Sequence, residues 1–139
     1  MTKPQVVTTG LTRSILWVGV LFVGLLAVAA GTVSASSPHS HVALITLEGV
    51  IDPISADYVS RALNTAADRE AALAIILLDT PGGLLNATRD IVEDILASDM
   101  PVVVFVSPAG SQAASAGTFV LAAGDLAAMA PYTNVGSAS

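Results

Sequence analysis

The sequence predicts an α/β fold made of repeated β-α units with a mainly parallel sheet. Three observations support this prediction. Hydrophobic residues make up 53 % of the 139 residues and charged residues only 12 %, which indicates a compact domain rather than a disordered chain. Short apolar runs alternate with segments of helical period, as in parallel sheets. One run, LAIILLD at 73–79, is apolar throughout, which is typical of a strand covered on both faces.

Before this domain, the N-terminal residues predict a secretory signal or membrane anchor. No residue from Ser14 to Ser37 is charged, and residues 15–30 are apolar or glycine. The basic flank and the small residues at 33–35 are typical of a signal cleaved after Ala35. Residues 11–33 are also long enough for an uncleaved anchor. We expect residues 1–35 to be this segment, 36–40 a linker, and the domain that follows to be exported to the periplasmic or extracytoplasmic side.

The first half of the domain is predicted to be strand, helix, strand. Residues 41–47 are expected to form a buried strand, and Asp52-Pro53 supplies the cap and first-turn proline of a helix that ends near Asp68. Six consecutive apolar residues at 73–78 cannot alternate between core and water, so 73–79 is expected to be a fully buried strand. The inner face of the helix is predicted to hold Val59, Ala62, Leu63 and Ala66.

The second half continues the alternation. Residues 84–97 predict a helix, 102–106 a strand, 113–123 a buried helix of small and apolar residues, and 126–130 a fourth strand followed by a turn-like segment at 133–136. Four strands and three helices leave a sheet edge and a helix face uncovered, so the chain is expected to be C-terminally truncated. The inner side of the 84–97 helix is predicted to hold Thr88, Ile91, Val92, Ile95 and Leu96.

Charge and composition exclude several classes of function. Residues 36–139 carry three arginines against all eleven acidic residues, a formal charge of −8, which argues against nucleic-acid binding. The absence of cysteine excludes disulfides, thiolate metal sites and a cysteine nucleophile. No cluster of residues suggests a metal or an organic cofactor.

Two motifs are expected at the carboxyl edge of the sheet, where ligands of parallel sheets bind. In the first, Pro81-Gly82-Gly83 follows a strand, and its glycines let backbone N–H groups approach a ligand. In the second, Ser115 is expected in the first turn of a helix with only small neighbours, as a nucleophile requires. The N–H groups of Gly83 and Ala116 would then form an oxyanion hole. Taken singly, the first motif could be only a turn and Ser115 only a packing residue.

Three motifs occur in a distinctive order: LLDTPGG at 77–83, SPAGSQAASAGT at 107–118 and AAMAPYTNVGSA at 127–138. With them, residues 42–139 resemble the N-terminal ClpP-class domain of NfeD-type membrane-bound serine proteases. The resemblance implies a ClpP/crotonase-type fold, a Ser–Lys dyad, homo-oligomers, and cleavage of hydrophobic segments of membrane-associated proteins. It assigns Ser115 as the nucleophile and Gly83 and Ala116 as oxyanion donors, with Pro81, Gly82 and Gly117 in the supporting turn.

One departure from the family pattern concerns the base, because Lys3 is the only lysine in the sequence. In the family the lysine lies after the segment equivalent to 134–139, followed by membrane helices, so this partial protease domain (41–139) is expected to be inactive by itself. His39 and His41 are too far from the motifs in sequence to replace the lysine, and Asp79 is expected either to orient the glycine turn or to act as a cap.

Three alternatives remain at this point. Signal peptide peptidase A has a similar glycine turn, but its serine helix typically reads Ser-Gly-Gly-Tyr where this chain has Ser115-Ala116-Gly117-Thr118. A non-catalytic membrane scaffold or binding module would need no lysine. A crotonase-type acyl-CoA enzyme also uses an oxyanion hole, but an export signal disfavours this alternative because acyl-CoA chemistry is cytosolic.

Overall fold

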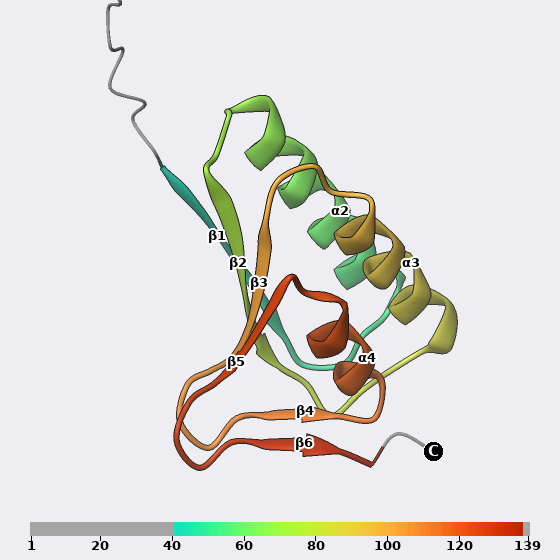
Figure 1. Ribbon diagram of the computed structural model, residues 1–139. Helices are drawn as coiled ribbons and strands as arrows, with labels where there is room; N and C mark the ends of the chain where they lie inside the picture. The colour runs from blue at the N-terminus through green and yellow to red at the C-terminus, as the bar shows by residue number, and fades with distance from the viewer. Residues whose placement is uncertain (1–40, 138–139) are drawn as a thin grey trace, which may run out of the picture. The chain divides into compact units, whose positions relative to one another are not determined.

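The centre of the fold is a four-stranded parallel sheet with the strand order β1-β2-β3-β5 (Figure 1). The strands are β1 (Val42–Glu48), β2 (Leu73–Asp79), β3 (Val102–Val106) and β5 (Leu126–Met129). This computed structural model describes residues 41–137. All three pairings in the sheet are parallel, which confirms the predicted α/β class with a mainly parallel sheet.

Three helices lie on the same side of this sheet: α2 (Pro53–Asp68), α3 (Leu85–Leu96) and α4 (Ala116–Ala123) (Figure 1). They cover rows of side chains that are in register across the strands, such as Ile45–Ile76–Val104 and Leu47–Leu78–Val106. These buried rows and the buried helix residues form one hydrophobic core. The predicted inner faces are largely confirmed, because Val59, Leu63, Ala66, Thr88, Ile91 and Ile95 are buried, whereas Ala62 and Val92 are half-buried. Leu96 was placed wrongly: it is the last residue of α3 and is 70 % exposed.

The opposite face of the sheet is apolar and partly exposed. Leu44 is 64 % exposed and Leu126 is 59 % exposed. Both predicted strands are present, but the prediction that 41–47 is buried and 73–79 fully buried is wrong for residues 41–137. The side chains alternate between buried and more exposed positions, because all the helices described there cover the other face. The apolar residues that the strands present on this open face are Val42, Leu44, Leu73, Ile75, Leu77, Val103, Phe105 and Leu126.

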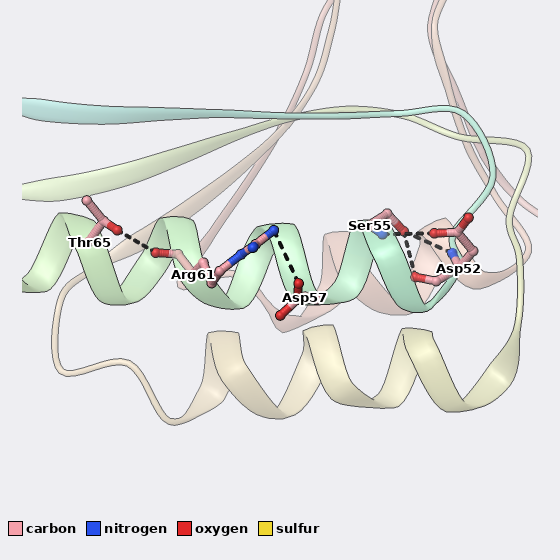
Figure 2. Close-up of polar contacts among 5 residues, drawn as sticks. All are labelled: Asp52, Ser55, Asp57, Arg61 and Thr65. Carbon is pink, nitrogen blue, oxygen red and sulfur yellow. Dashed lines mark hydrogen bonds and ion pairs between the residues drawn. The ribbon is translucent and has the colours of Figure 1, made fainter.

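Helix α2 begins with a capping box, which confirms the predicted start of the helix. The Ser55 N–H donates to Asp52 Oδ1 over 2.8 Å, and the Asp52 N–H donates to Ser55 Oγ over 2.9 Å (Figure 2). Further along α2, Arg61 forms an exposed ion pair with Asp57, and Thr65 Oγ1 donates to the Arg61 carbonyl (Figure 2). The capping box satisfies N–H groups that have no partner inside the helix, whereas the ion pair lies in solvent.

Replacing Asp52 with alanine is expected to lower the free energy of unfolding by about 1 kcal/mol, because the Ser55 N–H loses its acceptor. Asp57→Ala, in the same helix, is the matched control and is expected to lower it by about 0.5 kcal/mol or less, because exposed ion pairs contribute little. Urea denaturation of the two variants measures both values. Equal losses would contradict the importance of the cap.

The segment predicted as one helix at 113–123 and the turn predicted at 133–136 both need correction. Residues Gln112–Ala114 form a strand, β4, which pairs in parallel with β6 (Asn134–Gly136), and α4 begins only at Ala116. The two strands lie side by side below the main sheet (Figure 1). Alanines favour a helix locally, but here the backbone of residues 112–114 finds strand partners in β6 and at Thr80. Helix α4 is also less buried than predicted, since Phe119 is 54 % exposed.

The expected signal or anchor at 1–35 and the linker at 36–40 lie outside the described residues. Within residues 41–137, no helix combines the length and the apolar character needed to cross a bilayer.

Candidate active site

The two motifs predicted from the sequence meet at the carboxyl end of β2. The Thr80 N–H donates to the Gln112 carbonyl over 2.7 Å, and the Ala114 N–H donates to the Thr80 carbonyl over 3.0 Å. Asp79 Oδ1 accepts a third hydrogen bond from the Gln112 N–H over 3.0 Å. These bonds attach β4 to the end of β2, so the segment that leads to Ser115 is held beside the glycine turn. Asp79 therefore contacts the serine segment through its side chain, rather than the glycine turn.

Ser115 occupies the junction between β4 and α4, one residue before the helix, and not the first helical turn as predicted. Its backbone has φ 50° and ψ −115°, a conformation that favours glycine and has an energetic cost of about 1–3 kcal/mol in other residues. The Ser115 N–H donates to the Gly136 carbonyl over 2.7 Å, and the Ser115 carbonyl accepts from the Thr118 N–H over 3.0 Å. The surrounding strand and helix thus hold the serine in a sharp strand-to-helix turn, a geometry that α/β-hydrolases also use at their serine.

The side chain of Ser115 makes no hydrogen bond within the described residues. It is half-buried, and Ser115 Oγ makes no hydrogen bond to the helix that it precedes. Serines in this position usually cap the helix with Oγ. Across residues 41–137, Oγ has no other hydrogen-bond partner either.

Two glycines allow the turn and the serine segment to approach closely. Gly82 has φ 110°, and a Cβ there would lie 2.8 Å from Ser115 Cβ and 3.2 Å from Ala116 N. A Cβ on Gly117 would lie 2.5 Å from Thr80 Cγ2. Any larger residue at either position would push the turn and the helix apart. Pro81 is exposed and begins the turn.

Gly83 is placed differently from Gly82. It lies against the loop between β1 and α2, where a Cβ would collide with the Ile51 backbone. The Ile51 N–H donates to the Gly82 carbonyl and the Leu84 N–H donates to the Ile51 carbonyl, both over 2.9 Å. The Gly83 N–H itself, like the Ala116 N–H at the start of α4, has no acceptor within residues 41–137.

Sequence reasoning missed two contributors to this site. Thr80 is fully buried, and its hydroxyl binds Gly82 on both its N–H and its carbonyl. A threonine two residues before a glycine in a turn is a known local signal, and it was present in the first motif. Gly136, which binds the Ser115 N–H and also accepts from Thr118 Oγ1, comes from a segment predicted only as a turn.

Two hollows on the described surface are lined by residues other than Ser115 and the glycine turn. A hollow of about 230 Å³ lies beside Asp79 at the carboxyl edge and is lined by Thr46, Glu48, Leu77, Asp79, Ser107 and Pro108. A larger one, of about 600 Å³, lies near Met100 and Pro101 before β3, away from Ser115. In the described part of the chain, no group of three potential metal ligands gathers.

Comparison with known proteins places these features in a family context. The sequence of residues 41–139 matches the protein family described as the NfeD1b N-terminal domain. The membrane-bound protease PH1510 of Pyrococcus horikoshii is 41 % identical over 91 residues, which is 66 % of this chain and 21 % of that protein. The membrane protein NfeD1b of Bacillus subtilis is 31 % identical over 121 residues, 87 % of this chain and 26 % of that protein. The chain thus spans about a fifth to a quarter of the length of these relatives.

Solved structures agree with this family context. Two variants of the 1510-N membrane-bound stomatin-specific protease match with TM-scores of 0.68 and 0.69 and identities of 38 and 39 %. They match 69 and 70 % of this chain and 46 and 45 % of those chains. In one a serine is replaced by alanine, and in the other a lysine is replaced by alanine and a substrate peptide is bound. A ClpP1 variant from Listeria monocytogenes, 22 % identical, has a TM-score of 0.61 over 66 % of this chain and 53 % of its own, and shows the shared fold.

Proposed function

Because the chain belongs to the NfeD1b N-terminal domain family, we propose that its complete protein is a membrane-associated serine endopeptidase with Ser115 as the nucleophile. One observation carries this proposal. A serine with a strained backbone and a hydroxyl that has no hydrogen bond within residues 41–137 lies directly against a glycine turn. A serine that served only packing would gain nothing from this strain.

The second part of the proposal is an oxyanion hole formed by the N–H groups of Gly83 and Ala116. Both groups lack an acceptor in the described residues, and Ala116 begins a helix whose N-terminal end favours negative charge. When Ser115 Oγ adds to a substrate carbonyl, the carbonyl oxygen becomes negative, and these donors would stabilise it. Losing one such donor typically raises the barrier by about 3 kcal/mol.

The third part concerns the base. The 139 residues contain one lysine, Lys3, which precedes the domain. The 1510-N structure with a bound peptide carries a lysine-to-alanine replacement, which supports a Ser–Lys dyad in that protein. We propose that a lysine outside this sequence accepts the Ser115 proton, for which its pKa would have to be lowered by burial. Residues 1–139 alone should then be inactive.

The proposed substrates are hydrophobic segments of membrane-associated proteins. The solved 1510-N relative is described as stomatin-specific. The relatives from Pyrococcus horikoshii and Bacillus subtilis are named as a membrane-bound protease and a membrane protein. The apolar, uncharged segment at 15–30 supports a membrane location, with residues 41–139 on the exported side.

A fluorophosphonate probe tests the proposal on the complete protein. It forms a covalent bond with an activated serine much faster than with an ordinary one, so mass spectrometry of the labelled protein is expected to find the adduct on Ser115. Hydrolysis of an apolar peptide should accompany labelling, and a charged peptide of equal length should be a poorer substrate. No adduct on Ser115, together with no hydrolysis of either peptide, would disprove the proposal.

A non-catalytic membrane scaffold is the second candidate. It is compatible with the absence of lysine from residues 36–139. In that case the complete protein would bind an apolar peptide without hydrolysing it, and the Ser115→Ala variant would bind it equally well.

Self-association is expected from the open face of the sheet, where Leu44 and Leu126 are each more than half exposed. Contiguous apolar surface of this kind usually marks an interface. Sedimentation of the complete protein in detergent is expected to show an oligomer, and Leu44→Glu should shift it toward the monomer. A monomer for the unsubstituted protein over a range of concentrations would contradict this expectation.

A further inference from the structure

Thr80 connects the two halves of the candidate site. It is fully buried at the end of β2, and both of its backbone polar groups bind the segment that leads to Ser115. The hydroxyl group of its side chain binds the glycine turn, and the methyl group lies against Gly117. One residue therefore contacts the turn, β4 and the start of α4.

The hydroxyl controls the backbone of Gly82. Thr80 Oγ1 accepts from the Gly82 N–H over 3.0 Å and lies 3.3 Å from the Gly82 carbonyl oxygen, to which it donates. The Ile51 N–H holds the same carbonyl from the β1–α2 loop over 2.9 Å. A glycine pair without these bonds could rotate its peptide planes at little cost, because glycine accepts both signs of φ.

The orientation of the Gly83 N–H follows from these bonds. The peptide between Gly82 and Gly83 is planar and trans, so its carbonyl and its N–H point in opposite directions. Holding the carbonyl toward Thr80 and Ile51 directs the Gly83 N–H away from them and keeps it free of protein acceptors in residues 41–137.

We infer that Thr80 is a positioning residue whose hydroxyl holds the Gly82–Gly83 peptide in the orientation that presents the Gly83 N–H to the substrate oxyanion. This inference rests on the proposed protease function. Thr80 is fully buried and its hydroxyl binds Gly82 rather than Ser115 Oγ, and its methyl group has a separate role in setting the distance to Gly117.

Two variants of the complete protein separate these roles. Thr80→Val keeps a methyl group against Gly117 and removes the hydroxyl, and it is expected to lower kcat by about 10- to 100-fold with little change in KM, somewhat less than full loss of an oxyanion donor. Thr80→Ser keeps the hydroxyl and is expected to retain kcat within a few-fold. Thr65→Val is the control, since it removes an exposed threonine hydroxyl bond on α2. Inhibition by a peptide aldehyde, whose hemiacetal oxygen occupies the oxyanion position, should weaken in parallel with kcat/KM.

The outcomes are distinguishable. If the unsubstituted protein hydrolyses peptides and Ser115→Ala does not, an unchanged kcat in Thr80→Val would overturn the inference and leave the proposed function standing. Equal losses in Thr80→Val and Thr80→Ser would assign the effect to packing and overturn it as well. If no variant is active, the proposed function fails, and hydrogen exchange still tests the bond. The Gly82 amide should lose protection in Thr80→Val and keep it in Thr80→Ser, and equal protection in both would overturn the inference.

Discussion

Replacing Ser115 with alanine is expected to lower the kcat/KM of the complete protein for an apolar peptide by at least about 10⁴-fold, as removal of a catalytic serine does in other proteases. The free energy of unfolding should change little, because Ser115 Oγ forms no hydrogen bond within residues 41–137 and alanine keeps the same Cβ. Steady-state hydrolysis and urea denaturation measure the two quantities.

Ser60→Ala is the matched control for this substitution. Ser60 is also half-buried, but it lies on α2, away from the glycine turn. It should leave hydrolysis unchanged. If Ser115→Ala retained the turnover of the unsubstituted protein, Ser115 could not be the nucleophile. If it unfolded the protein, its role would be structural.

Replacing Gly82 with alanine is expected to have the second-largest effect. The new Cβ would lie 2.8 Å from Ser115 Cβ, and the backbone has φ 110°, which L-residues rarely adopt. Strain and overpacking together should lower the free energy of unfolding by about 2–5 kcal/mol. The turn can relieve the contact only by moving away from Ser115, so kcat should fall by about 10²-fold or more through loss of the Gly83 donor.

Gly49→Ala separates strain from contact. Gly49 also has a positive φ, of 88°, but a Cβ there meets no atom within 4 Å. This control should show the backbone strain alone, a loss of about 1–3 kcal/mol, with hydrolysis retained. Equal loss of stability and of hydrolysis in both variants would show that the approach of Gly82 to Ser115 is unimportant.

Much of the fold could be predicted from local patterns. The bounds of 73–79 and 102–106 match β2 and β3, and the helix at 53–68 matches α2. These elements are set by signals within one segment: a continuous apolar run ended by proline and glycine, or a capping aspartate followed by proline. Their burial was harder to predict, since the exposure of Leu44 depends on which face of the sheet the helices cover.

The candidate site was predicted only as a set of residues. Composition and motif order identified Ser115 and the glycine turn, because small residues beside a serine are visible in the sequence. Their roles as nucleophile and oxyanion donors remain proposals to be tested by the variants above.

By itself, the sequence determined the four strands of the main sheet, most of the three helices, and which residues are small enough to let two segments meet. Tertiary structure alone decided that residues 112–114 form a strand rather than part of a helix. Their backbone partners lie at Thr80 and in β6, which are distant along the chain. It also decided the strained turn at Ser115 and the hydrogen bond from Ile51 to Gly82. Local energies oppose such a turn, so it persists only where contacts from several segments together outweigh its strain.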